Sequence, residues 1–250
     1  PKNEIKIGLI GKYVELQDSY KSILESLIHA GSENQTKVNV VSIHSEHINK
    51  KQIKEVISKL DGILVAPGFG ERGIEGKIQS IKCAREENIP FFGICLGMQM
   101  AVIEFARNVL KLEKANSTEM DSDTKFPVIS LMADQKDVIS KGGTMRLGSW
   151  KCEIKKGSKI YDIYKKENIQ ERHRHRWEVN NEYISSMKKN GLSTSGINPD
   201  TGLVEVIELP KNDWFIGVQF HPEYKSTVES PHPLFVSFVE ACLKNKNSKN

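Results

Sequence analysis

The stretch that decides the fold is residues 91–99, which read Phe-Phe-Gly-Ile-Cys-Leu-Gly-Met-Gln. Its first four residues are an apolar run typical of a buried strand, and an apolar helical pattern runs from Met98 to Arg107. Glycine stands close to Cys95 on both sides, which is the pattern of a sharp strand-to-helix turn that carries a nucleophile. The stretch therefore predicts a thiol displayed at the carboxyl end of a strand, where open α/β sheets bind ligands.

Strands and helices alternate upstream of this turn. Apolar runs and 3.6-residue periodicity predict strands over 5–10, 38–43 and 62–66, and helices over 19–30, 53–60 and 76–87. Strands that alternate with helices of this length indicate an α/β fold, with a mostly parallel central sheet flanked by helices and joined by right-handed crossovers.

The second half of the chain is richer in strands. Further strands are predicted over 128–132, 143–147, 169–177, 203–208 and 214–220, a helix from Tyr183 to a cap at Gly191, and a closing helix over 233–243. These strands predict an additional antiparallel part. No repeat or low-complexity linker divides the chain, so we expect one domain over 1–250, with a frayed polar tail over 244–250.

Composition excludes several classes of protein. Of the 250 residues, 38% are hydrophobic and 27% charged, which supports a sizeable core and argues against disorder. The net charge of +4 is spread along the chain, and no apolar run is long enough to cross a bilayer, so we expect no nucleic-acid or membrane partner. The four cysteines form no C-x-x-C pair, which predicts a reducing, cytoplasmic setting. Because the chain begins with Pro1 rather than Met, we expect it to be part of a longer protein.

A thiol nucleophile needs a base, and the base needs an orienting group. His221 ends an apolar strand and is followed by Pro222 and Glu223, whose carboxylate can accept a hydrogen bond from the imidazole. Cys95, His221 and Glu223 are therefore a candidate triad. The histidines on other helices and loops are expected to lack such a partner: His29, His44, His47 and His232.

Residues 68–73, Gly-Phe-Gly-Glu-Arg-Gly, match the dinucleotide-binding pattern G-x-G-x-x-G. Pro67 before the first glycine and Glu71 beside a pyrophosphate both oppose that reading. The alternative is an oxyanion hole, in which the backbone N–H of Gly68 is paired with that of Leu96.

The densest basic run is residues 171–177, Glu-Arg-His-Arg-His-Arg-Trp. In a strand it would separate into an arginine face and a histidine face. A nucleic-acid site would need more basic surface than this run, and the rest of the chain provides none. A zinc site would need more ligands than His173 and His175, and none stands at a workable spacing. A single arginine that holds a substrate carboxylate is the more economical interpretation.

Together, residues 93–99 and the His-Pro-Glu motif at 221–223 resemble the class I, triad-type glutamine amidotransferases. Residues 116–119, 142–148 and the Arg-His-Arg-His-Arg run are narrower and resemble the glutaminase domain of CTP synthases. The similarity covers about residues 5–243. It implies a class I glutamine amidotransferase-like fold and an enzyme that releases ammonia from glutamine.

The resemblance also implies a role for each candidate residue. Cys95 corresponds to the nucleophile, His221 to the general acid and base, and Glu223 to its orienter. One departure is Ala66-Pro67, where the family often has Pro-Gly. The implied glutamine-binding positions are Gly68 and Leu96 at the oxyanion, Gln99 and Glu119 on the substrate, with Glu119 facing the α-ammonium, and Arg176 on the α-carboxylate.

Partners follow from the same resemblance. In the family, ammonia passes to an N-terminal synthetase domain, part of a homo-oligomer, which aminates UTP with ATP and Mg. No cofactor or metal is implied in the glutaminase domain itself, and GTP is implied as an activator whose lid residues would be Arg72, Thr144 and Arg146. Two rival classes stay open: a γ-glutamyl hydrolase or cysteine peptidase of the same fold, and a non-catalytic regulatory module.

Overall fold

A nine-stranded sheet joins the two halves of the chain in the computed structural model, which describes residues 1–12, 20–47, 52–68, 70–131 and 145–249. The strand order is β2-β1-β3-β4-β12-β11-β10-β7-β8. The strands are β1 (Asn3–Gly11), β2 (Thr36–His44), β3 (Gly62–Val65), β4 (Phe91–Ile94), β7 (Arg146–Ile154), β8 (Asn168–His175), β10 (Ser193–Ile197), β11 (Val204–Glu208) and β12 (Phe215–Val218).

The direction of pairing changes once across this sheet. The strands from β2 to β12 pair in parallel, and those from β12 to β8 pair antiparallel. The predicted α/β class, with antiparallel strands added in the second half, is confirmed. Because β4 and β12 are parallel neighbours in register, with Ile94 opposite Val218, the residues that follow each strand emerge at the same edge.

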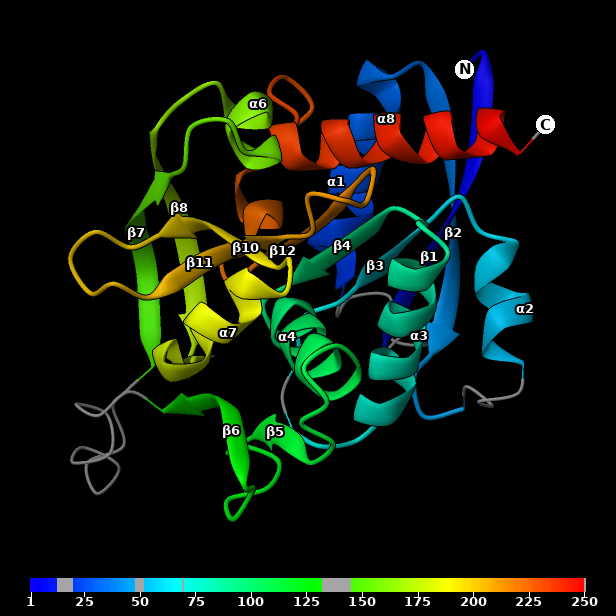
Figure 1. Ribbon diagram of the computed structural model, residues 1–250. Helices are drawn as coiled ribbons and strands as arrows, with labels where there is room; N and C mark the ends of the chain where they lie inside the picture. Colours follow the sequence, from blue (N-terminus) through cyan, green and yellow to red (C-terminus); the bar gives the residue numbers. More distant parts are fainter. Residues whose placement is uncertain (13–19, 48–51, 69, 132–144, 250) are drawn as a thin grey trace.

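Helices cover both faces of the sheet (Figure 1). One face packs against α1 (Lys21–Glu33), α6 (Lys159–Tyr164) and α8 (Pro233–Ser248). The other packs against α2 (Ile53–Ser58), α3 (Ile74–Glu86), α4 (Leu96–Asn108) and α7 (Ile184–Lys189). Each face has its own buried apolar cluster, so the parallel strands are apolar on both sides, as strands buried on two faces must be.

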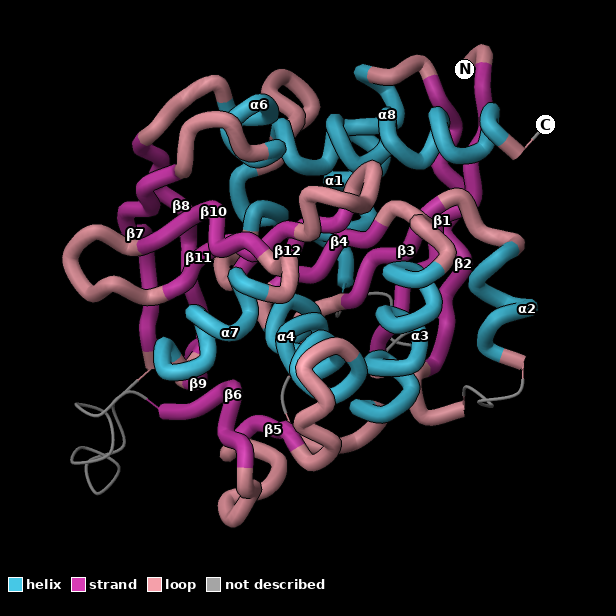
Figure 2. Tube along the Cα trace, viewed as in Figure 1, coloured by secondary structure: helices cyan, strands magenta, loops and turns pink. Residues whose placement is uncertain are grey.

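A small second sheet lies apart from the large one in Figure 2 and has the order β5-β6-β9. Its strands are β5 (Ala115–Ser117), β6 (Phe126–Leu131) and β9 (Trp177–Val179). The prediction of one strand over 169–177 is wrong here. The chain leaves the large sheet after His175, bends at Arg176, and pairs again as β9 with β6.

Several boundaries also differ from the sequence predictions. The strand predicted over 143–147 begins at Arg146 and runs to Ile154, while residues 143 and 144 lie outside the described part. The elements β5, β10 and α6 had not been predicted, since each is only three to six residues long.

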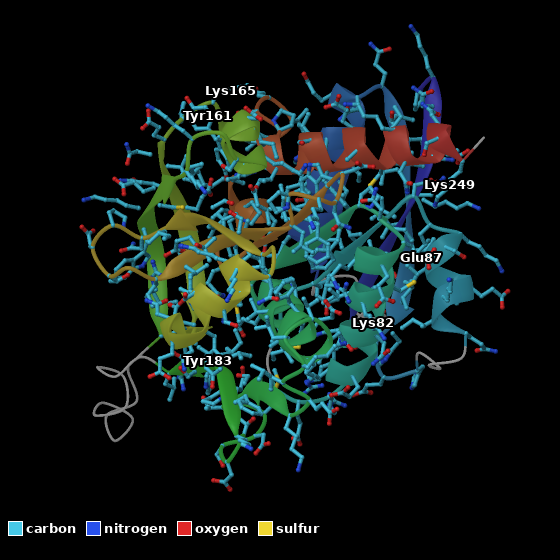
Figure 3. All side chains as sticks on the ribbon, viewed as in Figure 1. Lys82, Glu87, Tyr161, Lys165, Tyr183 and Lys249 are labelled. Atoms are coloured by element: carbon cyan, nitrogen blue, oxygen red, sulfur yellow. The ribbon has the colours of Figure 1, made fainter. Side chains whose placement is uncertain are left out.

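The polar tail does not fray as predicted, because α8 continues to Ser248. Asn245 Nδ2 donates to the Asp61 carbonyl at 2.9 Å, and Lys249 Nζ, labelled in Figure 3, donates to the Leu60 carbonyl at 2.9 Å. These long-range contacts fix the last turns to the loop before β3. In the described part of the chain, no helix is both long and apolar enough to span a bilayer.

Candidate active site

The predicted strand-to-helix turn is formed at Cys95, directly between β4 and α4. Cys95 has φ 52° and ψ −104°, a conformation that is strained for a residue with a side chain. The glycines make it possible: a β-carbon on Gly97 would lie 2.2 Å from the Val65 carbonyl oxygen, and one on Gly93 would lie 2.9 Å from that of Gly97. The turn holds the sulfur at the positive end of a 13-residue helix, where negative charge is favoured.

His221 lies beside this turn because β12 and β4 are neighbours. The Cys95 N–H donates to the Val218 carbonyl at 2.8 Å, which ties the turn to the strand that leads to His221. The His221 N–H donates in turn to the Arg172 carbonyl at 2.8 Å. Backbone hydrogen bonds therefore hold Cys95 and His221 in place without any contact between their side chains.

The imidazole of His221 lies between a carboxylate and the thiol. Its Nδ1 is 2.7 Å from Glu223 Oε1, and its ring stacks on Tyr224 with centroids 5.1 Å apart. Burial on its own would lower the pKa of His221, but the charges of Cys95 and Glu223 raise this pKa well above its usual 6.5. These two neighbours therefore favour the protonated form of the imidazole.

The loop after β3 brings Gly68 against the start of α4. A β-carbon on Gly68 would lie 3.6 Å from Leu96 Cδ2 and 4.0 Å from Lys77 Nζ. Gly68 and Leu96 are therefore neighbours beside the thiol, as an oxyanion hole built from their N–H groups requires.

Glu119 lies within electrostatic range of three cations, Lys12, Lys77 and Arg176. Glu119 Oε1 accepts a hydrogen bond from the Gly70 N–H at 2.9 Å. Burial raises the pKa of the Glu119 carboxyl, while Lys12, Lys77 and Arg176 act to lower it. Arg176 is half-buried at the bend between β8 and β9, and its Nε has no hydrogen-bond partner among the described residues. An anion and a cation held apart in this way suit an α-amino acid, whose ammonium and carboxylate can each find a partner.

The NH2 group of Gln99 is engaged inside the protein, so only its carbonyl oxygen is left to contact a substrate as predicted. Gln99 is 3% exposed, and its Nε2 donates to the Trp177 carbonyl at 2.8 Å and to Gln219 Oε1 at 3.1 Å. Both N–H bonds are thereby used inside the protein. Gln99 joins α4 to β9 and to the end of β12, directly behind the thiol.

Two of the three residues predicted as a GTP lid, Arg72 and Arg146, lie in different surroundings. Arg72 is exposed and lies 3.5 Å from Glu46, whereas Arg146 is buried and its guanidinium donates to Glu178 and Glu205. Thr144 lies outside the described residues. The interpretation of Arg146 as a lid residue is corrected: it is an internal ion-pair residue, because two buried carboxylates from distant strands converge on it.

The basic run separates into the two predicted faces. Along β8, arginines point to solvent and histidines are buried. His173 Nε2 lies 3.2 Å from Glu205 Oε2, and His175 Nε2 lies 2.7 Å from Glu178 Oε1. The histidine face thus packs onto the carboxylates that Arg146 binds.

Two of the histidines expected to lack a partner have one. His232 Nε2 lies 3.0 Å from Glu171 Oε1, and His29 Nδ1 lies 3.1 Å from Ser226 Oγ. His44 and His47 stack with their rings 4.3 Å apart and 20° from parallel. Although their nitrogens and a Glu46 oxygen lie within 4.8 Å of one another, lone pairs in two nearly parallel planes cannot converge on one metal ion.

Sequence reasoning missed two residues of this site, Lys77 and Gln219. Lys77 is 1% exposed on α3, and burial lowers its pKa to about 8, with Lys12 adding to the effect and Glu119 and Cys95 opposing it. Gln219 is fully buried, with its Nε2 3.6 Å from Cys95 Sγ. A signal existed for each, since Lys77 occupies an apolar-face position between Ile74 and Ile81, and Gln219 interrupts an apolar strand.

Replacing Lys77 by methionine is expected to stabilise the fold and to remove a pH dependence of its stability. The folded protein binds the Lys77 proton less tightly than the unfolded chain does, so stability rises with pH between about 8 and 10.5, and the full penalty is present at pH 7. Lys77→Met should raise the free energy of unfolding at pH 7 by about 1–3 kcal/mol and remove that pH dependence. Urea unfolding at pH 7 and pH 10 measures both.

The matched control is Lys82→Met on the same helix, labelled in Figure 3, whose side chain is 37% exposed. This variant should change the unfolding free energy by less than about 0.5 kcal/mol. A destabilised Lys77→Met protein would mean that the buried ammonium is well compensated, contrary to our interpretation.

The chain is similar to a known family and to several known proteins. Residues 15–241 match the family described as glutamine amidotransferase class-I. The CTP synthase of Christiangramia forsetii is 66% identical over 253 residues, covering 100% of this chain and 46% of that protein. The CTP synthase of Flavobacterium johnsoniae is 62% identical over 243 residues, covering 97% and 45%. The chain thus spans about half the length of the curated relatives it matches.

Among solved structures, the glutaminase domain of Trypanosoma brucei CTPS with bound acivicin matches with a TM-score of 0.91 at 37% identity. The match covers 96% of this chain and 94% of that chain. A glutamine amidotransferase from Thermotoga maritima matches with a TM-score of 0.53 at 11% identity, which is a likeness of fold alone.

Proposed function

The chain belongs to the class I glutamine amidotransferase family, in which it resembles the glutaminase domain of CTP synthases, and on that premise we propose that it hydrolyses glutamine to glutamate and ammonia through Cys95, His221 and Glu223. The observation that carries the proposal is the geometry of the turn: a buried thiol at φ 52° faces an imidazole whose other nitrogen is 2.7 Å from a carboxylate. The charges of Cys95 and Glu223 raise the pKa of His221, which suits this residue to act as a proton donor.

In the first half of the reaction, the Cys95 thiolate attacks the side-chain amide carbon of glutamine. The carbonyl oxygen takes the negative charge, and the backbone N–H groups of Gly68 and Leu96 stabilise it. His221 gives its proton to the departing nitrogen. The C–N bond breaks, ammonia leaves, and a γ-glutamyl thioester on Cys95 remains.

In the second half, neutral His221 takes a proton from a water molecule whose oxygen attacks the thioester carbon. The carbon–sulfur bond breaks, Cys95 leaves as a thiolate, and glutamate is released. Glu223 holds the imidazole in one orientation through both halves and balances its charge when it is protonated.

Substrate choice is assigned to Glu119 and Arg176. Glu119 is suited to the α-ammonium and Arg176 to the α-carboxylate, because each side chain carries the charge opposite to that of the group it meets. A cysteine peptidase has no use for a clamp on a free amino acid, and a γ-glutamyl hydrolase must admit a longer chain. An intact triad likewise favours an enzyme over a regulatory module.

The proposed binding of the substrate α-carboxylate by Arg176 is tested by Arg176→Lys. Lysine keeps the charge but cannot grip a carboxylate with two parallel N–H bonds, so we expect KM for glutamine to rise about tenfold to a hundredfold with little change in kcat. Steady-state ammonia release at varied glutamine measures both constants. Arg174→Lys, at an exposed position of β8, is the matched control.

An unchanged KM in Arg176→Lys would remove the clamp and favour the peptidase alternative. A large loss of kcat with unchanged KM would instead mean that Arg176 acts on the reacting centre.

The use of the ammonia is proposed from the relatives. Since the chain spans about half of each CTP synthase it matches, we propose that a synthetase domain consumes the ammonia to aminate UTP with ATP and Mg. Glutamine hydrolysis itself needs neither UTP, ATP nor Mg. Because the guanidinium of Arg146 is already bound by Glu178 and Glu205, we assign GTP activation to surfaces that include the synthetase domain.

A further inference from the structure

Gln219 is the residue of this site that the proposed mechanism does not use. It follows β12 directly, two positions before His221, and its side chain has no exposed surface. Its Nε2 lies 3.6 Å from Cys95 Sγ, and its backbone N–H donates to the Glu205 carbonyl at 2.9 Å. An amide is therefore held against the reacting sulfur from the side of β12 and β11.

The orientation of this amide is fixed by a chain of hydrogen bonds. The Trp177 carbonyl can only accept, so the group that meets it at 2.8 Å must be the NH2 group of Gln99. The same NH2 group meets Gln219 at 3.1 Å, so Gln219 must present its oxygen there. The NH2 group of Gln219 is then left facing the sulfur of Cys95.

Gln219 differs from the other groups that face the sulfur because it cannot titrate. Cys95 is faced by two cations, His221 from the loop after β12 and Lys77 from α3. His221 gives up its proton when ammonia departs and takes another from water. A glutamine amide donates throughout, so it can hold the sulfur in place when the imidazole is neutral.

We propose that Gln219 is a catalytic residue that donates a permanent hydrogen bond to the Cys95 sulfur, stabilising the thiolate and fixing its line of attack. The proposal rests on the proposed function in one respect, that Cys95 is the nucleophile. Trp177 and Gln99 are then positioning residues, since they act only by orienting Gln219.

The test is Gln219→Met, which keeps the length and approximate volume of the side chain and removes the donor. Hydrogen bonds to charged groups are worth enough to change thiolate formation measurably. We expect the pH of half-maximal alkylation of Cys95 by iodoacetamide, followed by mass spectrometry, to rise by about one unit. Glutamine turnover should fall about tenfold to a hundredfold.

Two further variants separate donation from packing. Gln99→Met leaves Gln219 in place but removes its orienting partner, so the alkylation profile should shift in the same direction by a smaller amount. Gln170→Met, exposed on β8, should leave the profile unchanged. If Gln219→Met does not fold, Gln219→Asn replaces it as the test. This variant shortens the side chain by one methylene, which moves the amide away from the sulfur, and the same rise in the alkylation pH is expected.

An alkylation profile unchanged in a folded Gln219→Met or Gln219→Asn protein overturns the proposal, with folding checked by circular dichroism and melting temperature. Alkylation does not depend on glutamine. If the unmodified chain released no ammonia, the proposed function would fail while the profile still tested Gln219. If the unmodified chain were active and the profile unshifted, the role of Gln219 alone would fail.

Discussion

Cys95→Ala is expected to lower ammonia release from glutamine by about four to six powers of ten, because the covalent route disappears with the sulfur and the remaining groups have no nucleophile to activate. The fold should survive, since alanine is smaller than cysteine and the turn is set by its glycines and by the Cys95 N–H bond to Val218. Ammonia release with enzyme in large excess measures the residual rate.

A chemical control accompanies that variant. An electrophilic analogue of glutamine should label Cys95 in the unmodified chain and spare the other three cysteines, because burial raises the pKa of each of their thiols: Cys83, Cys152 and Cys242. Label on one of these three with Cys95 untouched would contradict the assignment of the nucleophile. So would a Cys95→Ala protein that retains turnover.

His221→Ala is expected to lower turnover by about 10²–10⁴-fold, since one group serves as both acid and base. Glu223→Gln should cost less, because the amide still orients the ring. It should also move the basic limb of the pH–rate profile to lower pH, because the Glu223 carboxylate raises the pKa of His221 and its loss lowers that pKa.

The order of these effects matters more than their size. If Glu223→Gln were more damaging than His221→Ala, the roles of the two residues would be wrong. A basic limb that stayed in place in Glu223→Gln would mean that Glu223 does not act on the imidazole charge.

The sequence was sufficient for the parts of the site that local patterns encode. The turn at Cys95 needs only nearby glycines, and Glu223 is within reach of His221 because Pro222 fixes the short link between them. Parallel strands are likewise readable as apolar runs between helices. These features depend on neighbours in the chain, which a single sequence contains.

Residues whose partners are distant in the chain were not predictable in the same way. The family resemblance implied Arg146 as a lid residue, but Arg146 is buried because the carboxylates of Glu178 and Glu205 reach it from other strands. The bend at Arg176 depends on the pairing of β9 with β6, a strand that lies far away in the sequence, and no local pattern specifies that pairing. Gln99 was assigned to the substrate, while its NH2 group binds Trp177 and Gln219.

The measurement that tests the central claim most directly is product formation from glutamine by the unmodified chain. We predict that ammonia and glutamate appear in equal amounts, that neither appears with Cys95→Ala, and that no CTP forms when UTP and ATP are added. Absence of ammonia from a folded chain whose Cys95 still reacts with the electrophilic glutamine analogue would contradict the proposal that this chain is a glutaminase.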